Sequence, residues 1–161
     1  MTRARLRSWI LLACVAGLAC AGPLGPIPGG ALSGAVAPAP ESWDFTANVQ
    51  TIQLETGPGR PHSVNVWCLG LGARLYVPTS MVMGPVDPLE RTWVRNVDAD
   101  GAVRVRIDGQ IYAMRAVRVT DPQELVDVRN RLRTKYELER STRGRDQTGW
   151  IFRLEPRELA R

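Results

Sequence analysis

The chain of 161 residues is long enough for one domain with a substantial core but too short for two. Its 21 basic and 16 acidic residues give a formal net charge of +5, yet three of the basic residues lie among the first twenty, where there is no acidic residue. Without this segment, 18 basic residues face 16 acidic ones, which is too small an excess for binding nucleic acid through its phosphates.

The first twenty residues have the layout of a secretory signal. Three arginines precede an apolar run, Trp9–Ala19, which is too short for a convincing membrane span. Cys20 follows Ala-Gly-Leu-Ala, a pattern that resembles a bacterial lipobox, although Gly17 stands where leucine is usual. We therefore predict a signal peptide over 1–20, lipidation of Cys20, and an exported chain that its lipid anchors to the cell membrane or outer membrane.

Three alternatives stay open for this segment. Cys14 follows Leu-Leu-Ala, a closer local match, but its use would leave an unusually short apolar stretch. Ordinary signal cleavage would leave no lipid, and an uncleaved leader would itself anchor the chain. If Cys20 is lipidated and the preceding residues are removed, Cys68 is the one thiol left, so no intramolecular disulfide can form.

Residues 21–42 are rich in proline and glycine and poor in large side chains. Such a composition disfavours regular pairing, and it supplies too few apolar side chains to offset the entropy cost of ordering the segment. We predict a flexible tether that holds the domain, residues 43–157, about 25 Å clear of the lipid headgroups.

Six segments of the domain alternate between apolar and polar residues with the period of a β-strand. They are 49–56, 63–69, 74–78, 102–107, 111–119 and 150–154. Between the fourth and fifth, Asp108-Gly109 is a strong signal for a two-residue hairpin, because both positions of a type I′ turn need positive φ. That turn pairs Ile107 with Gln110. The face expected in the core is then Val103, Val105, Ile107, Tyr112, Met114 and Ala116.

The pattern Asp-Pro-x-Glu occurs twice, at 87–90 and 121–124, and we predict that a helix begins at each. The aspartate can cap the helix, proline fits the first position where no N–H is needed, and glutamate follows three residues after the cap. The second helix carries an apolar stripe that needs a sheet to cover: Leu125, Val128, Leu132 and Tyr136. The fold class is therefore mainly β, a six-stranded antiparallel split barrel with two helices, with a sandwich as the alternative.

Few residues suited to catalysis or metal binding occur in the chain. His62 is the only histidine and Lys135 the only lysine, so no set of ligands has the spacing of a zinc site. A catalytic triad would have to recruit His62 from a proline-containing turn, where a solvent-facing histidine is the simpler interpretation. Cys68 alternates with apolar strand residues, as a buried structural thiol would. No catalytic or metal-binding residue is assigned.

The domain nevertheless resembles a known family. The resemblance rests on the stretches LETGPGRPHSVNVWCLGLGARLYVPTS, TWVRNV and IFRLEP, and covers roughly residues 49–156. In this order they resemble the split β-barrel flavin- and deazaflavin-binding proteins, most closely the deazaflavin-dependent nitroreductase branch and more distantly the pyridoxamine-phosphate-oxidase-like domains. The resemblance implies FMN or a deazaflavin as cofactor, in a groove beside the barrel, and it allows a homodimer.

By that resemblance seven residues approach the cofactor: Arg60, Ser63, Asn65, Thr79, Ser80, Trp93 and Asn96. The chain departs from the family where the turn is shortened to GPGRPHS and where MVMGPVD replaces a glycine-rich loop. Five of these residues also have a purely structural interpretation. Trp93 would anchor the core, Asn96 would end a helix, Arg60 would be a solvated turn residue, and Thr79 and Ser80 would end a strand.

Two functions therefore stay open. The resemblance favours a membrane-anchored protein that binds flavin or deazaflavin, with a nitroreductase-like oxidoreductase as its more specific form. The export route favours a cofactor-free binding or scaffold module of the cell envelope on the same barrel. The leader lacks the adjacent arginines that are typical of export in a folded, cofactor-loaded state, so the cofactor would have to be found outside the cytoplasm.

Overall fold

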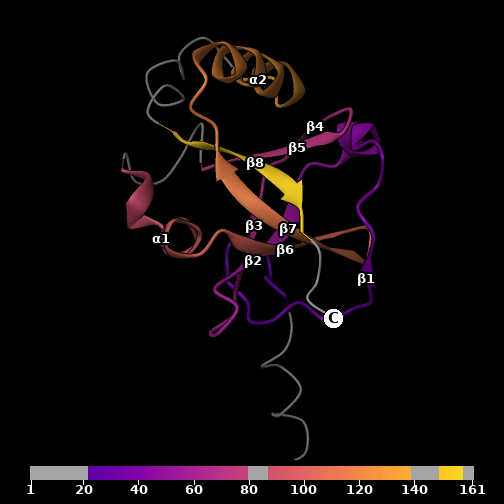
Figure 1. Cartoon of the computed structure of the whole chain (residues 1–161), viewed down its shortest axis with the longest axis vertical. Helices are drawn as coiled ribbons and strands as arrows, with labels where there is room; N and C mark the ends of the chain where they lie inside the picture. The colour runs from indigo at the N-terminus through magenta and orange to yellow at the C-terminus, as the bar shows by residue number, and fades with distance from the viewer. Residues whose placement is uncertain (1–21, 80–86, 139–148, 158–161) are drawn as a thin grey trace, which may run out of the picture.

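The computed structural model describes residues 22–79, 87–138 and 149–157, and its centre is one curved sheet with helices at the edges (Figure 1). The strands are β1 Val36–Ala37, β2 Ile52–Thr56, β3 His62–Val66, β4 Leu69–Leu71, β5 Arg74–Pro78, β6 Ala102–Ile107, β7 Gln110–Arg118 and β8 Ile151–Pro156. The helices are α1 Thr92–Ala99 and α2 Pro122–Lys135, with short 3₁₀ turns η2 Asp44–Asn48 and η3 Pro88–Glu90. The sheet runs β3-β2-β6-β7-β8-β5-β4 through antiparallel pairs, and β1 joins β7 in parallel.

The predicted fold class, mainly β with two helices, is confirmed, and each of the six predicted strands is present. The count of six is too low, because β1 and β4 are also part of the sheet. Both are very short, two and three residues, so neither shows a readable alternation. Gly70 in β4 permits a close approach of η2, since a Cβ there would lie 2.1 Å from the carbonyl oxygen of Trp43.

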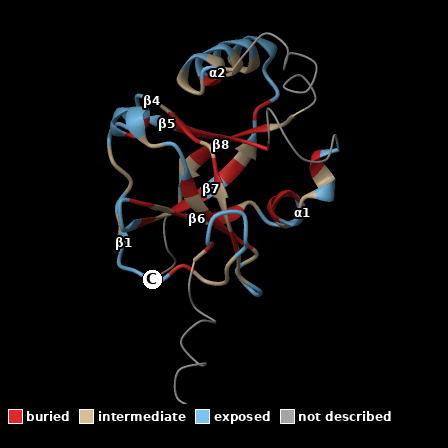
Figure 2. Cartoon of the chain, turned by 180° about the vertical axis from the view of Figure 1, so that it is seen from behind, coloured by how far each residue is buried: buried red, intermediate tan, exposed pale blue. Residues whose placement is uncertain are grey.

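Two apolar clusters hold the elements together, and Figure 2 shows the buried residues following the sheet. The larger cluster lies on one face of the sheet and includes Trp43, Leu54, Val105, Met114 and Leu154, with α1 contributing Trp93, Val94 and Val97. The smaller cluster packs α2 against β4, β5 and β8 through Leu69, Tyr76, Val128, Leu132 and Ile151. The apolar stripe predicted for the second helix thus covers the outer face of the sheet.

The predicted hairpin is confirmed. Asp108 and Gly109 have φ values of 48° and 81°, as a type I′ turn requires. The register pairs Ile107 with Gln110, and Val103 with Met114. The expected face is buried, apart from Tyr112, which is half-buried.

The two Asp-Pro motifs behave differently. Asp121 accepts a hydrogen bond from the N–H of Glu124 at 2.7 Å and caps α2. The helix begins at Pro122, as predicted. Asp87 caps only the short turn η3, and α1 begins at Thr92, so the predicted start of the first helix is wrong. The backbone of Arg91 is extended, which interrupts the helix. The guanidinium of Arg95 bonds the freed carbonyl oxygens of residues 89 and 90 and stabilises the break.

A substitution in the hairpin tests the turn. Gly109→Val should lower the free energy of unfolding by roughly 1 to 2 kcal/mol, because valine strongly disfavours positive φ. Gly109→Asn is the matched control and should cost less, since asparagine tolerates this region. Urea denaturation of both variants measures the difference. Equal stability of the valine variant and the unchanged protein would contradict the turn type.

Candidate functional site

The N-terminal strap, residues 22–37, lies along strands β3, β2, β6 and β7 instead of forming a free tether (Figure 1). The main chain of Gly29 exchanges hydrogen bonds of 2.8 and 2.9 Å with that of Ser63. Leu32 is only 2% exposed. Strand β1 pairs with β7 at Ile111 and Tyr112, on the edge that β8 does not cover. The expectation that this segment makes no regular pairing and adds nothing to the core is wrong, because the sheet supplies the partners that the segment itself lacks.

A buried ion pair fastens the strap to the sheet. Glu55 is 5% exposed, and its carboxylate accepts hydrogen bonds from the N–H of Leu32 and from Arg104, the latter at 3.2 and 3.3 Å. Beside it, Arg106 donates to the side chain of Gln53 and, at 3.1 Å, to the carbonyl oxygen of Ser33. The strand face that carries Arg104 and Arg106 therefore holds the strap.

Two of the predicted cofactor residues lie beneath this strap. Ser63 is fully buried, its main chain is paired with Gly29, and its hydroxyl has no hydrogen-bond partner among the described residues. The side-chain amide of Asn65 donates to the carbonyl oxygen of Gly25 at 2.8 Å. The strap thus uses or covers the polar groups that the resemblance assigns to a cofactor.

Arg60 and Asn96 come together at the turn between β2 and β3. Arg60 is exposed, and its N–H closes the turn on the carbonyl oxygen of Gly57 at 2.8 Å. The amide of Asn96, from α1, donates to the hydroxyl of Thr56 at 3.0 Å. Gly57 has a φ of 68°, and a Cβ there would lie 3.2 Å from the Asn96 amide nitrogen, so glycine serves both the turn and the contact.

The remaining predicted residues lie elsewhere. Trp93 is 5% exposed and packs edge-on against Phe152, with ring centroids 5.8 Å apart. Thr79 is buried, and its N–H and hydroxyl oxygen pair with the carbonyl oxygen and N–H of Trp150 at 2.8 and 3.0 Å. Ser80 lies outside the described residues.

A flavin or deazaflavin does not fit the arrangement of these residues. Ser63 and Asn65 lie beneath the strap, Arg60 and Asn96 lie at the turn between β2 and β3, and Trp93 and Thr79 lie elsewhere. Of these six described residues only Arg60 is exposed. The polar side chains of Asn65, Thr79 and Asn96 are already hydrogen-bonded to other parts of the protein. We therefore derive no chemistry through such a cofactor from this arrangement.

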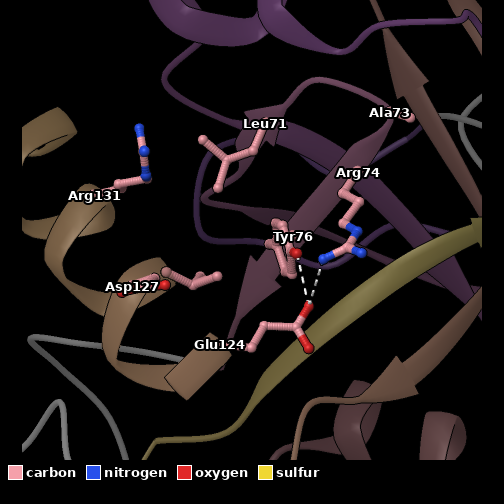
Figure 3. A pocket seen from close by; sticks show the side chains of 8 residues that line it. Leu71, Ala73, Arg74, Tyr76, Glu124, Asp127 and Arg131 are labelled. Atoms are coloured by element: carbon pink, nitrogen blue, oxygen red, sulfur yellow. Dashed lines mark hydrogen bonds and ion pairs between the residues drawn. The ribbon is translucent and has the colours of Figure 1, made fainter. Parts of the chain in front are cut away.

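An open groove of about 460 Å³ lies at the other end of the molecule, between α2 and the strands β4 and β5 (Figure 3). Its lining residues are Leu71, Ala73, Arg74, Tyr76, Glu124, Asp127, Val128 and Arg131. At its base the hydroxyl of Tyr76 donates to Glu124 at 2.7 Å, and Arg153 donates to both carboxylate oxygens of Glu124 at 2.9 Å. Arg74 lies 3.6 Å from the same carboxylate.

These contacts keep Glu124 ionised. Burial opposes its ionisation, but the hydrogen bonds from Tyr76 and Arg153 and the charges of Arg153 and Arg74 outweigh burial, so the pKa of Glu124 lies below its ordinary value. Burial and the bond to Glu124 raise the pKa of Tyr76, which stays a neutral donor. The groove therefore has a fixed negative charge at its base and two arginines, Arg74 and Arg131, along its sides.

Sequence reasoning missed this groove. Glu124 is part of the helix-start motif, and Tyr76 alternates with core positions, so each has a sufficient local explanation. The groove exists only because β5, α2 and β8 bring these residues together. No spacing in the chain signals that contact.

A second polar cluster joins the end of α2 to η2 and to the loop before β4. The ammonium group of Lys135 donates to the carbonyl oxygens of Thr46 and Cys68, both at 2.8 Å. Tyr136 donates to the carbonyl oxygen of Gln50 at 2.8 Å and stacks on Trp67 at a centroid distance of 4.1 Å. Burial raises the pKa of the Cys68 thiol although Lys135 is close, so this cysteine is a buried, protonated structural residue.

The described residues offer neither a cluster of metal ligands nor a helix suited to the interior of a membrane. Within residues 22–79, 87–138 and 149–157, no three His, Cys, Asp or Glu side chains gather in a way that could hold a metal ion. Across the same ranges, no helix combines the length and the apolar character needed to cross a membrane.

Comparison with known proteins identifies the fold. No protein-family model matches the chain, and no curated protein matches it. HutZ, the heme storage protein from Vibrio cholerae, is 18% identical with a TM-score of 0.53, over 72% of this chain and 87% of that chain. A conserved hypothetical protein from Mycobacterium tuberculosis is likewise 18% identical with a TM-score of 0.53, over 71% of this chain and 78% of that chain.

A third solved structure is a putative pyridoxamine 5′-phosphate oxidase from Listeria innocua, 14% identical with a TM-score of 0.50, over 71% of this chain and 90% of that chain. The domain is a split β-barrel. At these identities the likeness is one of fold alone.

The ionised Glu124 makes a pH-dependent contribution to stability. Because its pKa is lowered on folding, the contribution is full above the pKa of the unfolded chain and is lost as pH falls through the lower, folded pKa. At neutral pH, Glu124→Gln should lower the free energy of unfolding by roughly 1 to 2 kcal/mol, since it weakens the charged hydrogen bonds of a half-buried network.

Denaturation curves recorded from neutral pH down to about pH 3 test this expectation, because the difference in stability between the two proteins should narrow as pH falls through the lowered pKa of Glu124. Glu155→Gln is the matched control. Glu155 also bonds Arg153, at 2.9 Å, but its side chain is 45% exposed, so its loss should cost less than about 1 kcal/mol. Equal effects at all pH values would contradict the role of Glu124.

Proposed function

We propose that the protein is an exported lipoprotein whose split-barrel domain is a cofactor-free binding or scaffold module of the cell envelope. The strap is the observation that supports this proposal. It buries Ser63, accepts a hydrogen bond from the amide of Asn65, and is held in place by the buried Glu55 carboxylate, which also pairs with the half-buried Arg104. The groove at α2 is then the open surface on which such a module would take a ligand.

The groove suggests the class of that ligand. Leu71, Ala73 and Val128 give it an apolar part, and Arg74 and Arg131 place two guanidinium groups along it. Glu124 at the base is already bonded to Tyr76 and Arg153 and lies 3.6 Å from Arg74. An anionic ligand would therefore contact Arg131 and the exposed part of Arg74, in a lining that also contains Asp127. A small molecule with an apolar body and a carboxylate or phosphate group fits this chemistry.

A second candidate function is flavin or deazaflavin binding, with a nitroreductase-like oxidoreductase as its specific form. The fold supports it, and so does the unpartnered hydroxyl of Ser63 beneath the strap. In this alternative the strap moves aside, and Ser63 and Asn65 become available together with the exposed Arg60. A homodimer stays a prediction from the sequence resemblance.

Cofactor titration separates the two functions. The whole chain, purified with its anchor in detergent, should leave the fluorescence of FMN and of a deazaflavin unquenched at about 100 μM cofactor, well above a micromolar dissociation constant. The reason is that the strap already bonds or covers the residues that would grip the cofactor.

Two variants sharpen this experiment. Leu32→Ala loosens the strap without changing any predicted cofactor residue, and Arg60→Ala removes an exposed turn residue. Quenching by the unchanged protein that Arg60→Ala weakens would reject the cofactor-free proposal. Quenching that appears only with Leu32→Ala would favour the second function, with the strap as a cover that must move.

The lipid anchor has its own test. Cys20→Ser should abolish incorporation of radiolabelled fatty acid and shift the protein out of the lipid-modified membrane fraction, because serine cannot form the thioether that carries the diacylglycerol. Cys14→Ser is the matched control and should leave labelling unchanged. Labelling that persists in Cys20→Ser and disappears in Cys14→Ser would move the anchor to the earlier cysteine.

A further inference from the structure

Near its start, the strap forms an apolar hairpin over residues 24–28. Leu24 and Ile27 exchange main-chain hydrogen bonds of 3.0 and 2.9 Å, and Gly25 between them has a φ of 55°. The side chains of Leu24 and Ile27 are 66% and 65% exposed, the largest values among the exposed large hydrophobic residues of the described chain. All five residues of this apolar hairpin are exposed and none is charged.

The apolar hairpin is attached firmly to the barrel. The amide of Asn65 in β3 donates to the carbonyl oxygen of Gly25 at 2.8 Å. The next strap residue, Gly29, is paired through two main-chain hydrogen bonds with Ser63. The two exposed aliphatic side chains are therefore presented at a fixed position on the domain, and their exposure is not the fraying of a free terminus.

The chain between this hairpin and Cys20 is very short. Gly22 is already packed, since a Cβ there would lie 2.6 Å from the Arg106 guanidinium and 3.0 Å from Leu32. Only Ala21 separates it from Cys20. Two residue steps of extended chain span about 7 Å, in place of the 25 Å expected for a free tether.

We propose that the apolar hairpin is a membrane-contacting surface, in which Leu24 and Ile27 enter the interfacial layer of a phospholipid bilayer beside the lipid on Cys20. This inference rests on the proposed lipidation. A lipidated Cys20 brings the packed start of the strap to the headgroups, where exposed aliphatic side chains gain free energy by leaving water. Because the tip carries no charge, the contact does not depend on anionic lipid.

The contact would orient the domain as well as hold it. In Figure 1 the indigo start of the described chain, which contains the apolar hairpin, lies below the sheet, and α2 lies above it. A domain that contacts the bilayer through residues 24–28 therefore holds the groove at α2 away from the membrane. The acyl chains supply most of the affinity, and the hairpin limits the tilt of the domain.

The experiment uses the whole lipidated chain in vesicles of phosphatidylethanolamine and phosphatidylglycerol. Pro28→Cys provides an exposed thiol for an environment-sensitive fluorophore, and the buried Cys68 and the lipid-capped Cys20 do not compete for the label. Emission should shift to shorter wavelength on vesicle binding, and iodide quenching should fall. Val126→Cys on α2 is the control position and should show neither change, since Val126 is 50% exposed at the far end.

A third protein carries Pro28→Cys with Leu24→Ser and Ile27→Ser. Both replaced side chains are exposed, so folding should be unchanged, and the spectral shift should disappear while the protein still floats with the vesicles. A lipidated protein that floats but shows no shift at position 28 overturns the membrane contact and leaves the anchor standing. If the protein does not float with the vesicles and its mass shows no attached lipid, the proposed lipidation of Cys20 is wrong.

Discussion

The buried carboxylate of Glu55 is the interaction on which the distinctive part of this structure depends. A carboxylate that is 5% exposed is costly unless charged and polar partners surround it, and here Arg104 and the N–H of Leu32 do so. Arg104 is the direct cross-strand partner of Glu55 in the register of β2 and β6. The pairing of two central strands therefore creates the site that holds the strap.

The position of the strap has consequences at both ends of the domain. Where it crosses β3 it buries Ser63 and engages Asn65, so one face of a fold that occurs in quite different proteins is closed in this chain. At its start the strap is already packed at Gly22, so only Ala21 lies between the packed domain and Cys20. The groove at α2 depends on neither effect, because the Tyr76, Glu124 and Arg153 contacts hold it together independently.

Local patterns in the sequence were reliable where one segment contains both partners of an interaction. The type I′ turn at Asp108-Gly109 and the cap of Asp121 on Glu124 were predicted because each involves residues within three positions. The same reasoning failed at Asp87, where the motif is present but Arg91 is extended. There, the side chain of Arg95 donates to the freed carbonyl oxygens, and the Asp-Pro-x-Glu motif carries no information about that contact.

The sequence by itself determined the six longer strands, the hairpin register and the apolar stripe of α2, because periodicity and turn chemistry are local properties. Only the tertiary structure shows that the proline- and glycine-rich segment pairs with the sheet. Its partners lie far along the chain, 23 residues away for Leu32 and Glu55 and 73 for Ser33 and Arg106. Composition measures what a segment can bury against itself, whereas the strap is ordered by hydrogen-bonding groups and apolar surface that the sheet provides.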